Sequence, residues 1–255
     1  MSREKGSYSV QCVENALELL ESLTGENGFM TVTSLADKLK LSRNKTFRLL
    51  VTLEERGLVE RDEMSGNYRV GLSAVELAHK LLKSVNLIQL ARPVMVRLAR
   101  EHDEAVYLTV LQGDEVLFLD MVDSEQQVKA APLLGKRFPF FTNAAGKAIR
   151  AVESRDLLER LSLRRNRKMG IPDFAKLEAE LNTIRSKGVA VDLGGLGDGI
   201  IMVAVAVRDY AGKVVGALTL LGPSFRLLTD RLENEIIPSL REGADLLSIK
   251  FGYAR

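Results

Sequence analysis

The segment of residues 33–70 constrains the fold more than any other part of the chain, because it predicts two short helices followed by a β-hairpin. Thr33 precedes SLADKL and can cap a helix there, with Asp37 in its first turn. Ser42 is placed to cap the next helix, SRNKTFRLLVTLEERG, which Gly57 would end.

Flanking patterns extend this segment into a winged helix-turn-helix. Residues 9–24 place apolar side chains at helical spacing, with glutamates on another face. Short strands are expected at 58–59 and 68–70, joined by a turn over 62–67 that contains Ser-Gly. Three helices and a hairpin in so short a stretch are typical of that motif.

The helix that begins after Ser42 has two different faces. We expect Phe47, Leu50 and Leu53 to form its apolar stripe against the core, with Leu49 beside them. Five basic residues and no acidic one occur between Lys38 and Arg48, although the whole chain has a net charge of only +2. Such a local basic patch is the electrostatic footprint of a nucleic-acid-binding protein.

The N-terminal end of this helix could enter a major groove of double-stranded DNA. Asn44 could then pair with adenine, and Arg43 or Lys45 with guanine. Arg48 is better placed for phosphate, and two arginines of the hairpin could reach the backbone or the minor groove. The alternative is a winged helix used for protein contacts, with a solvated basic face. The expected DNA-contacting residues are Ser42, Arg43, Asn44, Lys45, Thr46, Arg48, Arg61 and Arg69.

We expect two domains: a winged helix-turn-helix at residues 1–70, a helical linker at 71–85 and a larger domain at 86–255. The larger part mixes hydrophobic strand patterns with helices, which is typical of an α+β domain with a largely antiparallel sheet. Strands are expected at 105–111, 115–122, 128–134, 189–193, 200–207 and 214–221, and helices at 86–102, 144–152, 154–161, 172–186 and 228–250.

Two glycine-containing segments resemble phosphate-binding loops but lack essential parts of them. Gly194–Gly199 is followed by a strand, whereas a dinucleotide loop needs a helix there to hold the pyrophosphate. We expect a flexible loop over a pocket instead. Residues 143–147, NAAGK, lack the leading glycine of a phosphate loop and the Ser/Thr after its lysine. A tight helix start beside a pocket is the favoured interpretation.

Composition gives little support to catalysis or metal binding. Cys12 is the single cysteine, which excludes an internal disulfide and a cysteine-based zinc site. His79 and His102 have no partner at metal-ligand spacing, and no catalytic Ser/His/Asp or Cys/His set is visible, so we expect no enzyme activity, cofactor or metal. The basic run at 164–168 is expected to be a solvated loop. With no apolar membrane span and no signal peptide, a cytoplasmic setting fits best.

Several segments, taken in order and spacing, resemble the IclR family of transcription regulators. The resemblance implies an effector-binding domain similar to the GAF sensor fold, a dimer or tetramer, and a partly palindromic DNA operator. It also implies that winged domains pair, with Val10, Val13 and Leu17 in core or dimer contacts. The segments are SVQCVENALELLESL, SLADKLKLSRNKTFRLLVTLEERGLVERDEMSGNYRVGLSAVELA, LARPVMVRLARE, LLGKRFPFFTNAAGKAI, IRSKGVAVD and GKVVGALTLLGPSFRL.

The resemblance also implies an effector pocket, from which this chain departs at three places. Met202 stands where the family often has cysteine, and Leu221 where a small hydroxyl residue is common, which favours a more apolar or aromatic ligand. The acidic residue usual after Asp192 is replaced by the Gly194–Gly199 loop, so the pocket is either reshaped or has lost its ligand. The expected effector-contacting residues are Phe140, Ala144, Ala145, Asp192, Met202, Thr219 and Leu221, with Phe141 as a further candidate.

Together these patterns predict a DNA-binding transcription regulator that is controlled by a small molecule, such as a metabolic, aromatic or apolar organic acid. A ligand that prefers one arrangement of the sensor domains would change the spacing of the paired winged domains. Two alternatives stay open: a small-molecule sensor or enzyme with a vestigial helix-turn-helix, and a protein-interaction module.

Overall fold

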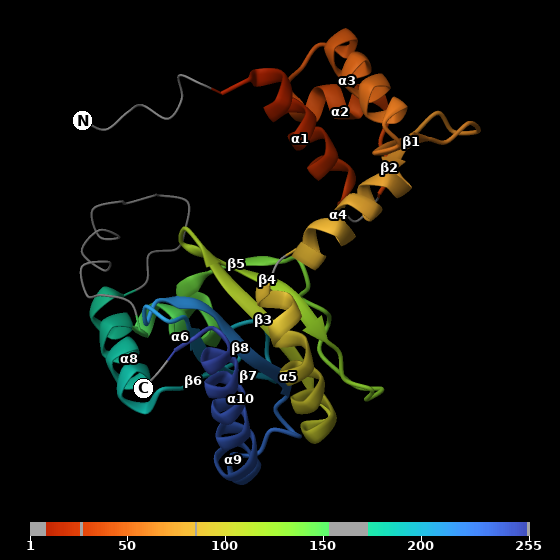
Figure 1. The fold of residues 1–255 in the computed structure, drawn as a ribbon. Coiled ribbons are helices and arrows are strands. Elements are labelled where there is room, and N and C mark those ends of the chain that lie inside the picture. Colours follow the sequence, from red (N-terminus) through yellow and green to blue (C-terminus); the bar gives the residue numbers. More distant parts are fainter. Residues whose placement is uncertain (1–8, 26–27, 85, 153–172, 254–255) are drawn as a thin grey trace, which may run out of the picture. The chain divides into compact units, whose positions relative to one another are not determined.

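The computed structural model describes residues 9–25, 28–84, 86–152 and 173–253. Internal contacts divide the chain into two compact units, Met1–Val85 and Asn86–Arg255, called here the winged domain and the C-terminal domain (Figure 1). Among the described residues, no helix is both long enough and apolar enough to span a membrane.

The described part of the winged domain has the expected order of helices and strands. The Ser42 hydroxyl caps the third helix by accepting a hydrogen bond from Lys45 N–H at 3.3 Å. The cap of the second helix is Thr31, which accepts from Ser34 N–H, so the prediction of Thr33 as the cap was wrong. The elements are α1 (Gln11–Leu23), α2 (Val32–Leu39), α3 (Arg43–Glu55), β1 (Val59–Arg61), β2 (Tyr68–Val70) and α4 (Leu72–Ser84).

One small apolar core holds the winged domain together. In α3 the predicted core residues Leu50 and Leu53 are buried, but Phe47 is 48 % exposed, so its assignment to the core was wrong. Thr46 is fully buried instead, because positions 46, 50 and 53 share one face of the helix. The core side chains are Leu19, Leu23, Leu35, Leu50, Leu53, Val59 and Tyr68.

The C-terminal domain is built on one antiparallel sheet with the strand order β5-β4-β3-β8-β7-β6, which confirms the α+β class with an antiparallel-rich sheet. The strands are β3 (Ala105–Gln112), β4 (Glu115–Val122), β5 (Arg137–Pro139), β6 (Ala190–Leu193), β7 (Ile200–Arg208) and β8 (Val214–Pro223). The helical elements are α5 (Asn86–His102), η1 (Phe140–Thr142), α6 (Ala144–Val152), α8 (Phe174–Lys187), α9 (Thr229–Arg231), η2 (Leu232–Ile236) and α10 (Ile237–Lys250).

Helices cover both faces of this sheet (Figure 1). On one face α5 and α10 pack over strand residues such as Leu108, Val203 and Leu218. On the other face η1, α6 and α8 pack over Tyr107 and Met202. Alternate residues of each strand therefore contribute to two separate cores, as the period of two in a β-strand requires.

One predicted strand of this domain was wrong, and one predicted helix lies outside the described residues. The chain at 128–134 is irregular, and the edge strand β5 begins only at Arg137. Pro132 has no N–H to donate to a sheet, and Gly135 turns the chain with a φ of +76° just before β5. The predicted helix at 154–161 and the basic run at 164–168 both fall in the part of the chain that is not described.

Candidate DNA-contacting helix and effector site

The N-terminal half of α3 presents exposed polar side chains. Ser42, Arg43, Asn44, Lys45 and Arg48 are all exposed. Among the described residues, none of these three basic side chains forms an ion pair. Their charge is therefore not cancelled within the domain and is available to an anionic partner such as a phosphate backbone.

Thr46, which was predicted to contact DNA, does not belong to this exposed set. Its side chain is fully buried, and its hydroxyl donates a hydrogen bond to the Ser42 carbonyl at 3.1 Å. The residue contributes to the core and to the first turn of α3, so its placement among the DNA-contacting residues is corrected.

The β1–β2 hairpin carries the two other predicted contacts, Arg61 and Arg69. Both are exposed, but Arg69 pairs with Glu60 across the hairpin, with an Nη2–Oε2 distance of 2.9 Å. The Leu72 N–H and then Arg69 hold the pKa of the Glu60 carboxyl below its ordinary value. Arg61 lies over the Tyr68 ring, 5.9 Å from its centroid. Of the two arginines, Arg61 is thus the one without a carboxylate partner in the described domain.

In the C-terminal domain, the structure brings most of the predicted effector residues onto one face of the sheet. Thr219 is buried on the same face, where its hydroxyl lies 3.3 Å from that of Thr109 in the neighbouring strand. Asp192 lies opposite Met202 in the β6–β7 register. The residues that share one buried cluster are Phe140, Ala144, Ala145, Met202 and Leu221, with Phe141 packed against it.

The NAAGK segment is a tight helix start, as expected. Asn143 is fully buried and its side-chain oxygen accepts a hydrogen bond from Gly146 N–H at 3.0 Å. A side chain at Gly146 would place its Cβ 2.2 Å from the Phe140 carbonyl oxygen. The glycine is therefore required because α6 packs directly on the backbone of η1, and phosphate binding is not needed to explain it.

The Gly194–Gly199 loop folds against the Asp192 carboxyl. A Cβ at Gly195 would lie 2.0 Å from an Asp192 carboxyl oxygen and 2.4 Å from the Thr142 carbonyl oxygen. Strand β7 follows the loop, so the helix that a dinucleotide site needs is not there. The loop closes over the Asp192 end of the cluster, and Leu196 packs against the same apolar side chains.

Two charged residues near Asp192 were not predicted from the sequence as part of this site. Lys147, only 9 % exposed, pairs with Glu180 of α8 at 2.8 Å. Burial raises the pKa of the Asp192 carboxyl above its ordinary value of 3.8; Lys147 opposes this shift and Glu180 adds to it. The Gly146–Lys147 dipeptide was a usable signal, because a lysine at the start of a buried helix needs a partner.

No set of three or more His, Cys, Asp or Glu side chains that could hold a metal ion occurs among the described residues. His102 is buried in α5 and its Nε2 lies within hydrogen-bond distance of the Ser239 hydroxyl in α10. Burial lowers the pKa of His102. This histidine joins two helices of the core and lies on the opposite face of the sheet from Asp192.

Two family models match the chain. Residues 12–63 match the IclR helix-turn-helix domain, and residues 79–249 match the bacterial transcriptional regulator IclR C-terminal domain. The HTH-type transcriptional regulator Rv1719 of Mycobacterium tuberculosis is 32 % identical over 215 residues, covering 82 % of this chain and 81 % of the relative. Neither the vestigial helix-turn-helix nor the protein-interaction alternative is favoured by these matches.

Solved structures show the same fold. The IclR of Thermotoga maritima superposes with a TM-score of 0.76 and 28 % identity, covering 95 % of this chain and 99 % of that one. An IclR homologue from Microbacterium hydrocarbonoxydans, crystallised with 4-hydroxybenzoate, gives a TM-score of 0.79 at 23 % identity and covers 94 % and 99 % of the two chains. The chain therefore belongs to the IclR family of transcription regulators, with a helix-turn-helix domain followed by an effector-binding C-terminal domain.

Proposed function

We propose that this regulator recognises its operator mainly through the exposed N-terminal half of α3. The observation that carries this proposal is the exposed set of Arg43, Asn44, Lys45 and Arg48, whose basic members have no ion-pair partner among the described residues. Asn44 and the two flanking basic residues would contact base edges, and Arg48 would contact phosphate. Arg61 would add a contact from the wing.

The test is binding of the purified full chain to the DNA upstream of its own gene, against a scrambled duplex, over a salt series. We expect specific binding with log affinity falling by about 0.9 per neutralised phosphate as log salt rises. The double substitution Arg43→Ala and Lys45→Ala should abolish the specificity. Arg56→Ala is the matched control, because Arg56 is also exposed but caps the opposite end of α3. Equal loss in both variants would contradict the proposal.

A self-association through α1 would give the regulator two winged domains for a palindromic operator. Val10, Val13 and Leu17 are 58 %, 53 % and 56 % exposed, so they do not serve the domain's own core. Three large apolar side chains along one helix face are costly in water and favour burial against a second copy. Val13→Glu should shift the sedimentation coefficient to that of a smaller species, whereas Glu14→Gln on the same helix should not.

The effector we propose is an aromatic or apolar organic acid. Phe140, Met202 and Leu221 form the buried apolar cluster into which the body of such a molecule would have to insert. Lys147 lies at its polar end beside Asp192 and could hold a carboxylate by charge and hydrogen bonding. A protein of the same fold was crystallised with 4-hydroxybenzoate, which supports an acid of this class.

The effector is tested by titrating aromatic and aliphatic carboxylates in a calorimeter. Aromatic members should bind, and Lys147→Met should weaken them about tenfold, the loss of one charge-assisted hydrogen bond. Asp198→Ala, an exposed acid of the glycine loop, is the control and should leave binding unchanged. If short aliphatic acids bind and aromatic acids do not, the proposed effector class is wrong.

Regulation follows if the effector prefers one arrangement of the C-terminal domains. It would then change the spacing of two paired winged domains, and so their match to half-sites about one helical turn apart. We also place this regulator in the cytoplasm and assign it no enzyme activity, consistent with relatives named as transcriptional regulators. DNA affinity that stays equal with and without every ligand that binds would contradict this mechanism.

A further inference from the structure

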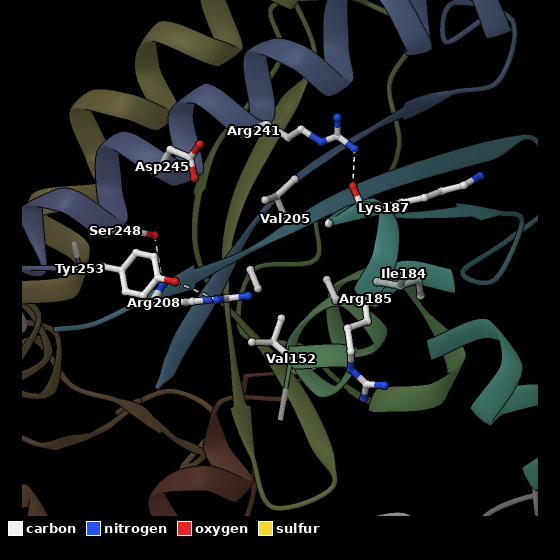
Figure 2. Close-up of a pocket in the computed structure, with 13 residues that line it drawn as sticks. Val152, Ile184, Arg185, Lys187, Val205, Arg208, Arg241, Asp245, Ser248 and Tyr253 are labelled. Carbon is white, nitrogen blue, oxygen red and sulfur yellow. Dashed lines mark hydrogen bonds between the residues drawn. The ribbon is translucent and has the colours of Figure 1, made fainter. Parts of the chain in front are cut away.

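A second recess in the C-terminal domain lies away from the proposed effector residues, at an edge of the sheet. Strand β6 pairs with β7 only from Ile201 to Ala204, whereas β7 continues to Arg208. A cavity of about 470 Å³ opens along this end of β7, on the side where β6 no longer pairs with it, between α6 and α8 on one side and α10 on the other (Figure 2). Its volume is within the range of small-molecule sites. We call it the β7-edge cleft.

Basic side chains dominate the polar lining of this cleft. Among the described residues that line it, Arg185, Lys187, Arg208 and Arg241 are basic, and Asp245, which has an interaction of its own, is acidic. Elsewhere in the described domain arginines such as Arg92, Arg150 and Arg226 each pair with a carboxylate. None of the three arginines of the cleft forms an ion pair with a described residue.

Neutral groups hold these guanidinium groups in place. Arg208 donates to the Tyr253 phenol oxygen at 3.0 Å and lies 5.5 Å from that ring's centroid. Arg241 donates to the Lys187 carbonyl oxygen, and Arg185 donates to the Ala151 carbonyl oxygen at 2.7 Å. Carbonyl and hydroxyl oxygens fix the position of a guanidinium group without cancelling its charge. The arginines are therefore pre-positioned and keep donors for an anion.

The surfaces between these arginines are apolar. Val205 lies between Arg208 and Arg241 in Figure 2, and Val152 and Ile184 line the side formed by α6 and α8. The side chain of Lys187 points away from Arg208 and Arg241 in this view, so its ammonium is a weaker candidate. An occupant should thus combine an anionic group with a small apolar or planar body.

We propose that the β7-edge cleft binds a small organic anion, with its carboxylate or phosphate groups on Arg208 and on Arg241, one on each side of Val205, and its body on Val205 and Tyr253. The site is distinct from the proposed effector site, because Arg208 is six residues along β7 from Met202, roughly 20 Å at the rise of an extended strand. The anion site at the β7-edge cleft does not depend on the effector proposed above. Because α6 contributes to both places, through Ala145 at its start and Val152 at its end, the two sites share one helix.

Equilibrium titration of the full chain with inorganic phosphate, succinate, citrate, phenyl phosphate and benzoate, in dilute chloride buffer, tests this inference. At least one of these anions should bind with a Kd below about 10 mM. Arg208→Gln and Arg241→Gln should each weaken it about tenfold, while Arg208→Lys, which keeps the charge, should weaken it less. Comparing the phosphate-containing anions with the carboxylates shows which anionic group the cleft prefers. Either preference supports the site.

Two control variants locate the binding. Arg100→Gln removes an exposed arginine of α5 that has no ion pair with a described residue, and should change nothing. Asp192→Ala alters the proposed effector site and should also leave the β7-edge binding intact. Absence of binding by all five anions, or binding that survives both Arg208→Gln and Arg241→Gln in folded protein, would overturn the proposal. Binding lost in Asp192→Ala but kept in the arginine variants would assign the anion to the effector site instead.

Discussion

The exposed face of α3 and the buried face of the C-terminal sheet are both candidate binding sites, but they are built in opposite ways. On α3, Arg43, Asn44, Lys45 and Arg48 project from a helix whose opposite face alone contacts the core. Around Asp192, the expected effector residues are themselves the core: Met202 is 1 % exposed and Ala144 fully buried. In the first site, function and packing are carried by different side chains, and in the second by the same ones.

This difference has a consequence for substitutions. Removing a side chain from the exposed face of α3 should cost DNA affinity and little stability, since surface substitutions change stability by less than about 0.5 kcal/mol. Removing one from the sheet face leaves a cavity, so it should cost stability first. Five substitutions test whether binding and packing separate in this way.

Gly146→Ala should have the largest effect. The new Cβ would lie 2.2 Å from the Phe140 carbonyl oxygen, and backbone cannot move aside cheaply, so we expect a loss of about 4 kcal/mol in the free energy of unfolding. Urea unfolding followed by circular dichroism measures it. Gly25→Ala is the control, because its nearest neighbouring atom is 3.8 Å away. A small, equal change in both variants would show that α6 is not held against η1.

Met202→Ala should cost about 3 kcal/mol of unfolding free energy, because it removes a side chain that is 1 % exposed inside the sheet layer. Met64→Ala, fully exposed in the hairpin turn, should cost almost nothing. Calorimetric melting of both variants gives the comparison. If Met202→Ala keeps wild-type stability yet gains affinity for a bulkier aromatic acid, then the site has spare room, and the contrast with α3 is weaker than stated.

Arg48→Ala should leave stability unchanged and weaken DNA binding by about 2 kcal/mol, the contribution of a hydrogen bond to phosphate. The slope of log affinity against log salt concentration should also be about one unit shallower than in the wild type. Fluorescence anisotropy across a salt series measures both. A fall in the melting temperature comparable to the loss of affinity would mean that Arg48 also supports the fold.

Ser42→Ala should affect both the stability of the fold and the affinity for DNA. Its hydroxyl accepts the Lys45 N–H, so losing it should cost about 1 kcal/mol of stability and loosen the first turn of α3. Ser42→Asp should restore the cap, yet place a negative charge beside DNA. We therefore expect Ser42→Asp to regain stability without regaining DNA affinity. Recovery of both would argue that this end of α3 lies away from phosphate.

Asp192→Asn should have the smallest effect and the opposite sign. Since burial raises the pKa of Asp192, its ionised form destabilises the fold, and this penalty grows as pH rises through the folded-state pKa. The variant should melt higher than wild type at pH 7, by less than about 4 °C, with the gain vanishing below pH 3.8. Asp198→Asn is the exposed control. A lower melting temperature at pH 7 would mean that Lys147 compensates the buried charge.

Local chemistry explains which parts of this structure could be predicted from the sequence. Ser42 as the cap of α3 and Gly57 just after its last turn were predictable, because each depends on a few neighbouring residues. The expected strand at 128–134 was wrong. Its apolar side chains, such as Val128 and Leu134, are more than half exposed in an irregular segment. Hydrophobicity alone could not show that Pro132 interrupts the segment.

The site residues followed the same division. The exposed polar face of α3 was predictable from charge, but helical phase placed Thr46 in the core and Phe47 outside, one residue from expectation. Lys147 and Glu180 are 33 residues apart in sequence and lie on two different helices. No local sequence pattern encodes such a pair. The β7-edge cleft could not be predicted for a similar reason. It exists only because β6 pairs with β7 as far as Ala204, while β7 continues beyond that residue.

The close packing of Gly146 on the Phe140 backbone also bears on how this domain could evolve new ligand preferences. A larger side chain at Gly146 would clash with the Phe140 backbone, so selection would tend to discard such a mutation. At strand positions such as Met202 and Leu221, a change in side-chain volume costs packing free energy but leaves the backbone pairing of the sheet intact. With the effector site proposed above, changes of specificity in descendants of this protein should therefore concentrate on β7 and β8, while the start of α6 stays unchanged.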